Sequence, residues 1–171
     1  MPETCKTNGE IMAKSKSKSL TRVEQALARA GVPAHILEMD GETRTAEQAA
    51  QKAGCALDQI AKSIIFQGEK SGAIYLFITA GANRVDSARA AQLTGEPLMR
   101  ADGKTVRDVT GFAIGGVAPI GHLSPIVAFY DPRLSDFDTV WAAAGTPRHI
   151  FEIAPAILRE ISAAKEAEFV C

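Results

Sequence analysis

Two apolar runs of seven residues, separated by five residues, place the strongest constraint on how this chain can fold. Residues 61–67 and 73–79 are rich in isoleucine, phenylalanine and other residues that β-strands favour, and the intervening residues 68–72 begin and end with glycine. A short glycine-containing connection between two such runs is typical of a β-hairpin. We therefore expect these runs to form a pair of antiparallel strands.

Helix and strand patterns follow one another irregularly along the rest of the chain. Helices are expected where a capping side chain precedes apolar residues at helical spacing, and strands where short apolar runs lie between turn residues. Without a regular βαβ alternation, these elements predict an α+β domain with a mixed sheet. The expected helices cover residues 19–30, 45–53, 87–93 and 102–109 and a final helix from Pro155, and the further strands cover residues 32–39, 97–100, 125–130, 138–144 and 148–153.

Length and composition favour one globular domain. The chain has 171 residues, of which 46% are hydrophobic, and this is enough for a core of the usual domain size. Residues 1–18 end in alternating lysine and serine and have little to bury, so we expect a mobile basic tail followed by a single domain over residues 19–171. The formal net charge of −1 leaves the kind of partner open.

Sequence signals for a membrane segment, a metal site or a reactive thiol are missing. No apolar run is long enough to span a bilayer, and the N-terminus lacks the apolar segment of a signal peptide, so we expect a cytoplasmic protein without a membrane partner. Cys5, Cys55 and Cys171 form no C-x-x-C pair and no metal-ligand spacing. None of them lies where a helix N-terminus or a basic partner would activate a thiol. We therefore expect no metal, no cofactor and no catalytic cysteine.

Residues 111–122 contain four glycines and one proline, and they carry few side chains that could build a core. Glycine allows positive φ angles and a close approach of the main chain to a ligand, and proline fixes one corner. Such a loop can hold a hydroxyl group or an anion through its main-chain N–H groups. A plain turn is the alternative interpretation, because clusters of glycine and proline are common in turns.

Lys62 is an unusual residue for its place, because it lies at the start of the first apolar run. A lysine with apolar neighbours can be held close to the protein body as a fixed cation. Alternatively, its aliphatic stem lies along the surface and its ammonium group stays in water, as in most lysines at strand edges. His122, at the end of the loop 111–122, and His149, close to a second glycine-proline corner at residues 145–147, are likewise open to a structural or a functional role.

Four segments of the chain occur in the order in which they occur in a known family: residues 61–66, 83–86, 115–122 and 141–147. Through these segments the chain resembles the YbaK family, the free-standing relatives of the editing domain that is inserted in bacterial prolyl-tRNA synthetase. The resemblance spans about residues 20–170, which is nearly the whole expected domain. It implies a mixed, mostly antiparallel curved sheet that is flanked by helices.

The resemblance also implies an activity, the hydrolysis of the ester that joins a wrong amino acid to the 3′-terminal adenosine of a tRNA. The enzyme would act in trans, typically on tRNA for proline that carries a small non-cognate amino acid. Its partners would be the 3′ acceptor end of aminoacyl-tRNA and prolyl-tRNA synthetase, and not DNA. In this interpretation Lys62 matches the functional lysine of the family, and further residues match its substrate-binding loops: Gly115, Gly116, Val117, Ala118, Pro119, Gly145 and His149.

The chemistry that the resemblance implies needs few groups, because an aminoacyl ester is already activated. Positioning a water molecule and stabilising the developing negative charge can supply most of the reduction of the activation barrier. Lys62 would hold the terminal phosphate or the carbonyl oxygen as a point charge, and the N–H groups of Gly115 and Gly116 would hold the carbonyl or the ribose oxygens. Two other functions stay open: a module of the same fold that binds tRNA ends or a nucleotide without turnover, and a hydrolase of small aminoacyl esters or amides.

Overall fold

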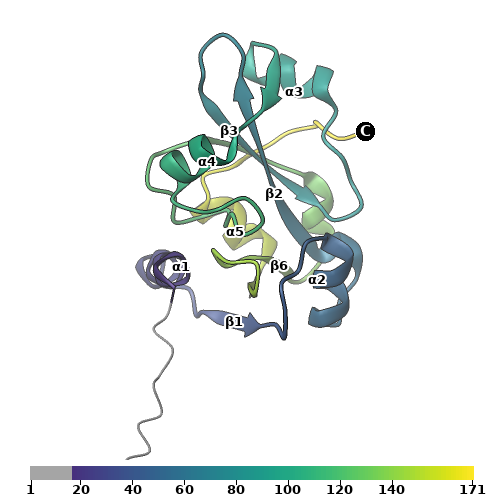
Figure 1. Cartoon of the computed structure of the whole chain (residues 1–171). Coiled ribbons are helices and arrows are strands. Elements are labelled where there is room, and N and C mark those ends of the chain that lie inside the picture. The colour runs from purple at the N-terminus through teal and green to yellow at the C-terminus, as the bar shows by residue number, and fades with distance from the viewer. Residues whose placement is uncertain (1–16) are drawn as a thin grey trace, which may run out of the picture.

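The computed structural model describes residues 17–171, and Figure 1 shows how their helices and strands are arranged. The first sixteen residues of the expected tail lie outside this range, and Lys18 is already the first residue of a helix. In the described part of the chain, eight strands form one sheet in the order β1-β7-β6-β2-β3-β5-β8, and β4 pairs with β2 beside this path. The strands are β1 (His35–Glu38), β2 (Ile60–Gly68), β3 (Ile74–Ala80), β4 (Leu98–Arg100), β5 (Val127–Tyr130), β6 (Val140–Ala143), β7 (His149–Ile153) and β8 (Lys165–Glu166).

The expected hairpin forms the middle of the sheet. β2 and β3 pair antiparallel from Ala61 opposite Ala80 to Gln67 opposite Ile74. The parallel neighbours β6 and β5 lie on the two sides of this hairpin, and β4 pairs antiparallel with the end of β2. β7 and β1 continue the sheet beyond β6 by antiparallel pairing. The predicted α+β fold with a mixed, mostly antiparallel sheet is therefore confirmed.

The helices begin and end close to the residues that the sequence predicts. The side chains of Thr45, Asp86 and Asp102 cap three of them by accepting hydrogen bonds from N–H groups of the first turn, and a glycine in the left-handed conformation ends each of the same three. None of the helices within residues 17–171 has the length and apolar character needed to cross a membrane. The helices are α1 (Lys18–Arg29), α2 (Ala46–Ala53), α3 (Ser87–Thr94), α4 (Gly103–Thr110) and α5 (Pro155–Ile161).

The sheet has a packed cluster on each face, because side chains alternate along a strand. On β2, Ile65 packs against the larger cluster, to which α1, α4 and α5 contribute, and Ile64 packs against the smaller one. In the smaller cluster the ring of Phe77 contacts those of Phe129 and Phe169 at centroid distances of 5.2 and 5.0 Å. The course of β2 is therefore fixed from both sides.

β8 is a strand that the sequence analysis did not predict. It pairs parallel with β5, with Lys165 opposite Phe129 and Glu166 opposite Tyr130. Both β8 residues are charged and exposed, so no apolar pattern marks them as a strand. Main-chain pairing with a buried neighbour, rather than the residue types of β8, defines this edge of the sheet.

One stretch of β2 keeps an open edge. β6 pairs with β2 only at Ile60 and Ala61, and β4 pairs with it only from Phe66 to Gly68. Residues 62–65 therefore have no strand partner on this edge within the described chain. This interval holds Lys62 and Ser63, and the main cavity of the candidate site lies beside it.

Candidate functional site

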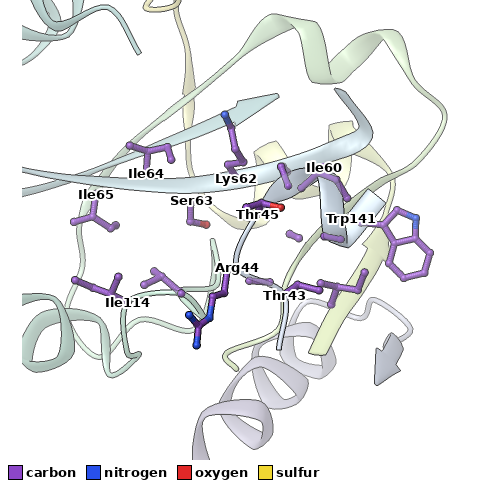
Figure 2. Close-up of a pocket in the computed structure, with 18 of the residues that line it drawn as sticks. Thr43, Arg44, Thr45, Ile60, Lys62, Ser63, Ile64, Ile65, Ile114 and Trp141 are labelled. Carbon is purple, nitrogen blue, oxygen red and sulfur yellow. The ribbon is translucent and has the colours of Figure 1, made fainter. Parts of the chain in front are cut away.

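A cavity of about 480 Å³ lies beside the open stretch of β2, and Figure 2 shows the side chains around it. Most of the side chains that line it are apolar, and the polar ones come from the segment before α2, from β2 and from the end of β4. A concave, mainly apolar site with a few polar groups is the usual form of a small-ligand site. The lining residues are 43–46, 49, 60–65, 100, 101, 106, 114, 115, 117, 141–143 and 150.

Side chains of β2 leave the strand alternately on its two faces. Lys62 and Ile64 point to one face, and Ser63 and Ile65 point to the other (Figure 2). The hydroxyl oxygen of Ser63 is buried and has no hydrogen-bond partner among the described residues. Buried polar atoms in folded proteins nearly always have a partner, so an isolated hydroxyl group in a cavity wall indicates a place for a ligand or water.

Lys62 is held in place by the main chain of a neighbouring turn. Its ammonium nitrogen Nζ donates a hydrogen bond of 2.7 Å to the carbonyl oxygen of Asn83. Lys62 also lines a second cavity of about 420 Å³, together with Arg44 and Arg84. The fixed-cation interpretation of Lys62 thus agrees with its geometry, and the charged lining of this second cavity consists of three basic side chains and the carboxylate of Glu47.

The electrostatic surroundings of Lys62 pull its pKa in both directions. Burial lowers the pKa of the ammonium group, and the neighbouring Arg84 adds to this effect. The carboxylates of Glu47, Asp131 and Asp58 act in the opposite direction, because they favour the charged form. The pKa of Lys62 is lowered overall, and the three acidic neighbours limit this shift.

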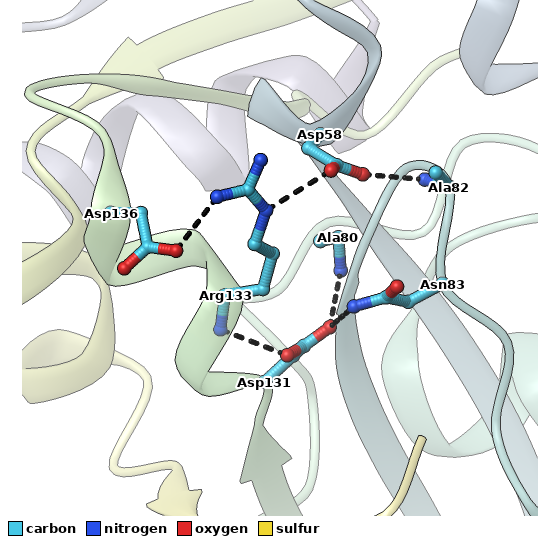
Figure 3. A network of polar contacts seen from close by, with 7 residues as sticks. All are labelled: Asp58, Ala80, Ala82, Asn83, Asp131, Arg133 and Asp136. Atoms are coloured by element: carbon cyan, nitrogen blue, oxygen red, sulfur yellow. Dashed lines mark hydrogen bonds and ion pairs between the residues drawn. The ribbon is translucent and has the colours of Figure 1, made fainter. Parts of the chain in front are cut away.

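A buried carboxylate fixes the turn that holds Lys62 (Figure 3). Asp131 is only 1% exposed, and its Oδ2 accepts hydrogen bonds from the main-chain N–H of Ala80 at 3.0 Å and from Nδ2 of Asn83 at 2.9 Å. Its Oδ1 accepts a third hydrogen bond of 3.0 Å from the N–H of Arg133. Asp131 thus reaches Lys62 indirectly, through the position of Asn83.

A second carboxylate, Asp58, holds the same turn at Ala82. Oδ1 of Asp58 accepts a hydrogen bond of 2.9 Å from the N–H of Ala82, and its Oδ2 pairs with Nε of Arg133 at 3.1 Å (Figure 3). Arg133 also pairs with Asp136 at 2.7 Å near the surface. The turn from Ala80 to Asn83 is therefore fixed by two carboxylates and one arginine.

The predicted glycine loop reaches the main cavity in part. Gly115 and Val117 line the same cavity as Lys62, whereas Gly116, Ala118 and Pro119 do not. Gly115 has a φ of +95° and open space where a Cβ atom would be. The N–H of Gly116 donates to the carbonyl oxygen of Ala113 at 3.0 Å, so this donor is used inside the loop. Gly115 is thus the glycine of this loop that faces a ligand space.

Close packing explains the two other glycine positions near the loop. A Cβ atom on Gly116 would lie 2.8 Å from the Cα of Thr146, and one on Gly145 would lie 2.7 Å from the carbonyl oxygen of Ser19. Gly145 lines neither cavity. In this structure both glycines allow the loop, the following turn and α1 to approach one another.

The two histidines have local partners outside the cavities. Nδ1 of His149 lies 2.6 Å from Oγ1 of Thr146, and its Nε2 lies 4.0 Å from a carboxylate oxygen of Glu38. Nε2 of His122 lies 2.7 Å from the carbonyl oxygen of Ala118, and burial lowers the pKa of this histidine. Neither histidine lines the space beside Lys62. Their contacts are those of residues that hold turns together.

Sequence reasoning missed several residues of the site, above all Ser63 and Arg44. Ser63 directly follows Lys62, and the two-residue period of a strand would have placed it on the opposite face. Arg44 precedes the helix cap Thr45, and its side chain is 84% exposed at the entrance. Residues 17–171 contain no group of three or more histidine, cysteine or acidic side chains that could hold a metal ion. The main cavity is mostly apolar and has the basic residues Lys62 and Arg44 in its lining. It can therefore bind a partly apolar ligand that carries a negative charge.

Comparisons with known proteins agree with this description. The family model of the aminoacyl-tRNA editing domain matches residues 40–161. The uncharacterized protein YwhH of Bacillus subtilis strain 168 is 34% identical over 136 residues, which are 80% of this chain and 86% of that protein. The crystal structure of a candidate trans-editing enzyme for prolyl-tRNA synthetase is similar with a TM-score of 0.85 and 44% identity, covering 92% of this chain and 99% of that one. The crystal structure of the hypothetical protein APE2540 gives a TM-score of 0.80 at 27% identity, covering 88% of this chain and 99% of that one.

Proposed function

The chain belongs to the family of aminoacyl-tRNA editing domains, and from this premise we propose that it is a deacylase that acts in trans on mischarged tRNA. The proposed substrate is tRNA for proline that carries a small non-cognate amino acid. The products would be the free amino acid and a tRNA with free 3′-terminal hydroxyl groups. The proposed setting is the cytoplasm, with prolyl-tRNA synthetase as a further partner.

One observation carries this proposal: Lys62, Gly115 and Val117 line a single cavity beside the open edge of β2. Gly115 and Val117 follow Lys62 by 53 and 55 positions in the sequence, and the fold brings them together with it at a mainly apolar space. A cavity of about 480 Å³ has room for a small aminoacyl group together with part of the terminal nucleoside. The size is more than a free small amino acid needs, which favours an acylated nucleic acid end over a free amino acid.

Lys62 would bind the phosphate of the terminal nucleotide. Its ammonium group is held by Asn83 and lines the second cavity, where Arg44 and Arg84 outnumber the one carboxylate, Glu47. A fixed charge in a partly desolvated position acts more strongly than one in water. Binding of the phosphate there would place the terminal ribose and its ester at the entrance of the main cavity.

The reaction would be the attack of a water molecule on the ester carbonyl. The bond between the carbonyl carbon and the ribose oxygen breaks, and the ribose oxygen takes up the proton that the water loses. Gly115 would offer its main-chain N–H to the ribose oxygens, and the vicinal 2′-hydroxyl group of the substrate would orient the water. Positioning and electrostatic stabilisation account for such a reaction without a nucleophilic side chain.

The test is a deacylation panel with tRNA for proline that carries alanine, serine, threonine, cysteine or 2-aminobutyrate. We expect at least one of these esters to be hydrolysed well above the rate in buffer, and the Lys62→Ala variant to lose nearly all of this activity. Lys70→Ala, which changes an exposed lysine at the hairpin turn, is the matched control and should keep full activity. If no ester is hydrolysed while the acceptor end is still bound, the chain is a binding module. If a free aminoacyl ester is hydrolysed equally well without the tRNA, it is a small-ester hydrolase.

A further inference from the structure

The open stretch of β2 presents main-chain groups to the main cavity. Residues 62–65 lie between the β6 pairing, which stops at Ala61, and the β4 pairing, which starts at Phe66. All four residues line the cavity. Along residues 62–65 the cavity lies at the edge of β2 where a neighbouring strand would otherwise pair.

The direction of these main-chain groups follows from the hairpin register. Gly68 donates its N–H to the carbonyl oxygen of Ala73, on the β3 side. Along a strand, the N–H and C=O of one residue point to the same edge and those of the next residue point to the opposite edge. The residues with odd numbers therefore turn away from β3. Among them, Ala61 meets β6 and Gln67 meets β4, whereas Ser63 and Ile65 meet no strand of the described chain.

The side chain of Ser63 adds an independent observation. Its Oγ atom is buried, lies in the wall of the same cavity and has no partner among residues 17–171. One residue thus carries three groups that a ligand can pair with: an N–H donor, a C=O acceptor and a hydroxyl group. Leaving the buried hydroxyl group of Ser63 unpaired is unfavourable, so the site is prepared for a ligand with complementary groups.

An aminoacyl group has the required complementarity. It is one residue of a polypeptide, with an amino nitrogen and a carbonyl oxygen spaced as in a strand, and an antiparallel partner exchanges both hydrogen bonds with the residue opposite. Addition of a strand-like ligand to an open edge is a common mode of peptide recognition. Lys62 leaves β2 on the face opposite to Ser63, so its charge does not occupy this place (Figure 2).

We propose that the aminoacyl group of the substrate lies against Ser63 as a single residue of an added antiparallel strand. Its α-amino group donates to the carbonyl oxygen of Ser63, its ester carbonyl accepts from the N–H of Ser63, and Oγ of Ser63 is a further partner of these polar atoms. This subsite rests on the proposed deacylase function. It assigns to the enzyme a requirement for an α-amino group on the acyl chain, whatever the size of the side chain.

The substrate series alanyl, lactyl and propionyl tests this requirement, because the three acyl groups are similar in size and differ at the α-position. Each ester is attached to the same tRNA, and each enzymatic rate is divided by the rate in buffer. We expect the acceleration to fall at least about thirtyfold from alanyl to propionyl, with lactyl between them, because the donors to the Ser63 carbonyl are lost in that order. Equal acceleration of alanyl and propionyl esters would overturn the subsite.

The Ser63→Ala variant tests the hydroxyl group separately. We expect alanyl-ester turnover to fall about five- to tenfold, and the preference for alanyl over propionyl to shrink, because the main-chain pair remains and one partner is removed. Ser124→Ala, an exposed serine outside the cavity, should leave both values unchanged. An unchanged preference in Ser63→Ala would remove the hydroxyl group from the subsite.

A binding assay separates this inference from the proposed function. Short RNA acceptor ends that carry 3′-alanylamido or 3′-propionylamido groups cannot be hydrolysed at the ester, so their affinities report recognition alone. We expect the alanylamido end to bind about tenfold more tightly or better. A preference for this end without turnover of any ester would support the subsite and reject the deacylase. Equal affinities together with turnover would support the deacylase and reject the subsite.

Discussion

The two faces of β2 at Lys62 and Ser63 differ in how their polar groups are satisfied. On the Lys62 face, the ammonium group binds Asn83, and Asp131 holds Asn83 within a set of partnered groups. On the Ser63 face, the hydroxyl oxygen is buried without a partner among residues 17–171, in the wall of a mainly apolar cavity. Adjacent residues of one strand therefore have opposite environments.

The difference separates two ways in which a site can be prepared. Full pairing of buried polar groups makes one geometry rigid, which suits a cation that must stay in one place. A buried group without a partner lowers the stability of the free protein, and a ligand can regain this free energy. In the functions proposed above, the Lys62 face holds a charge in one position, and the Ser63 face recognises the acyl group. The predictions below test this contrast.

The largest effect is expected from Lys62→Met, which keeps the length of the side chain and removes the charge. We expect the deacylation rate to fall by about a hundredfold or more, as for the loss of a group that stabilises charge at an active site. The free energy of unfolding should change by less than about 1 kcal/mol, because the loss of one hydrogen bond is offset by the burial of an apolar chain. Single-turnover kinetics and urea titration measure the two effects. A large loss of stability with little loss of rate would make Lys62 a structural residue.

Asp131→Ala should have the largest effect on stability. The variant leaves the N–H groups of Ala80 and Arg133 and the amide of Asn83 without their buried acceptor, which should cost about 3 kcal/mol or more. Asp136→Ala is the control, because it breaks only an exposed pair with Arg133 and should cost less than about 1 kcal/mol. Urea unfolding compares the two variants. Equal losses would show that the Asp131 network does not fix the turn.

Ser63→Ala should have a smaller effect on stability, and of the opposite sign. Removing a buried hydroxyl group that lacks a partner should raise the free energy of unfolding by about 1 kcal/mol, although the same variant loses activity. Ser124→Ala should leave stability unchanged within the error of the measurement. Destabilisation by Ser63→Ala would show that the hydroxyl group has a structural partner, and would remove the contrast between the two faces of β2.

Local signals in the sequence account for most of the fold. The cap Asp86, the glycine ends of the helices and the two apolar runs of the hairpin all act over a few residues, and the structure has the predicted elements there. β8 could not be predicted, because Lys165 and Glu166 form a strand only through the neighbouring β5. The open edge of β2 also depends on partners from distant parts of the chain, and no local pattern shows where β6 and β4 stop pairing.

The candidate site could be predicted only in part for the same reason. The resemblance selects Lys62 and the glycine loop, and the structure brings Lys62, Gly115 and Val117 to one cavity. The roles of all the predicted site residues stay predictions. Five of these residues lie outside both cavities: Gly116, Ala118, Pro119, Gly145 and His149. Glycine in a sequence can mean contact with a ligand or close packing of two main chains, and the difference depends on the tertiary structure.

The smallest effect concerns the pH at which Lys62 loses its charge. Burial lowers the pKa of Lys62, and Glu47 at the start of α2 opposes this shift more strongly than Asp131 or Asp58. If activity needs the ammonium group, the rate falls as the pH rises through this lowered pKa. Glu47→Gln removes a carboxylate that favours the charged form, so the alkaline limb of the rate profile should move to lower pH.

Arg84→Gln should move the same limb in the opposite direction, because the positive charge of Arg84 lowers the pKa of Lys62. Glu69→Gln, which changes an exposed residue just after β2, is the control and should leave the limb in place. The profiles are measured as single-turnover rates divided by the rate in buffer at each pH, because free hydroxide also cleaves the ester. Shifts of opposite sign in the two variants would identify Lys62 as the titrating group, since a general loss of packing cannot move the limb in both directions. Shifts of the same sign would place the titrating group elsewhere, and the contrast between the two faces of β2 would then be one of geometry and not of charge.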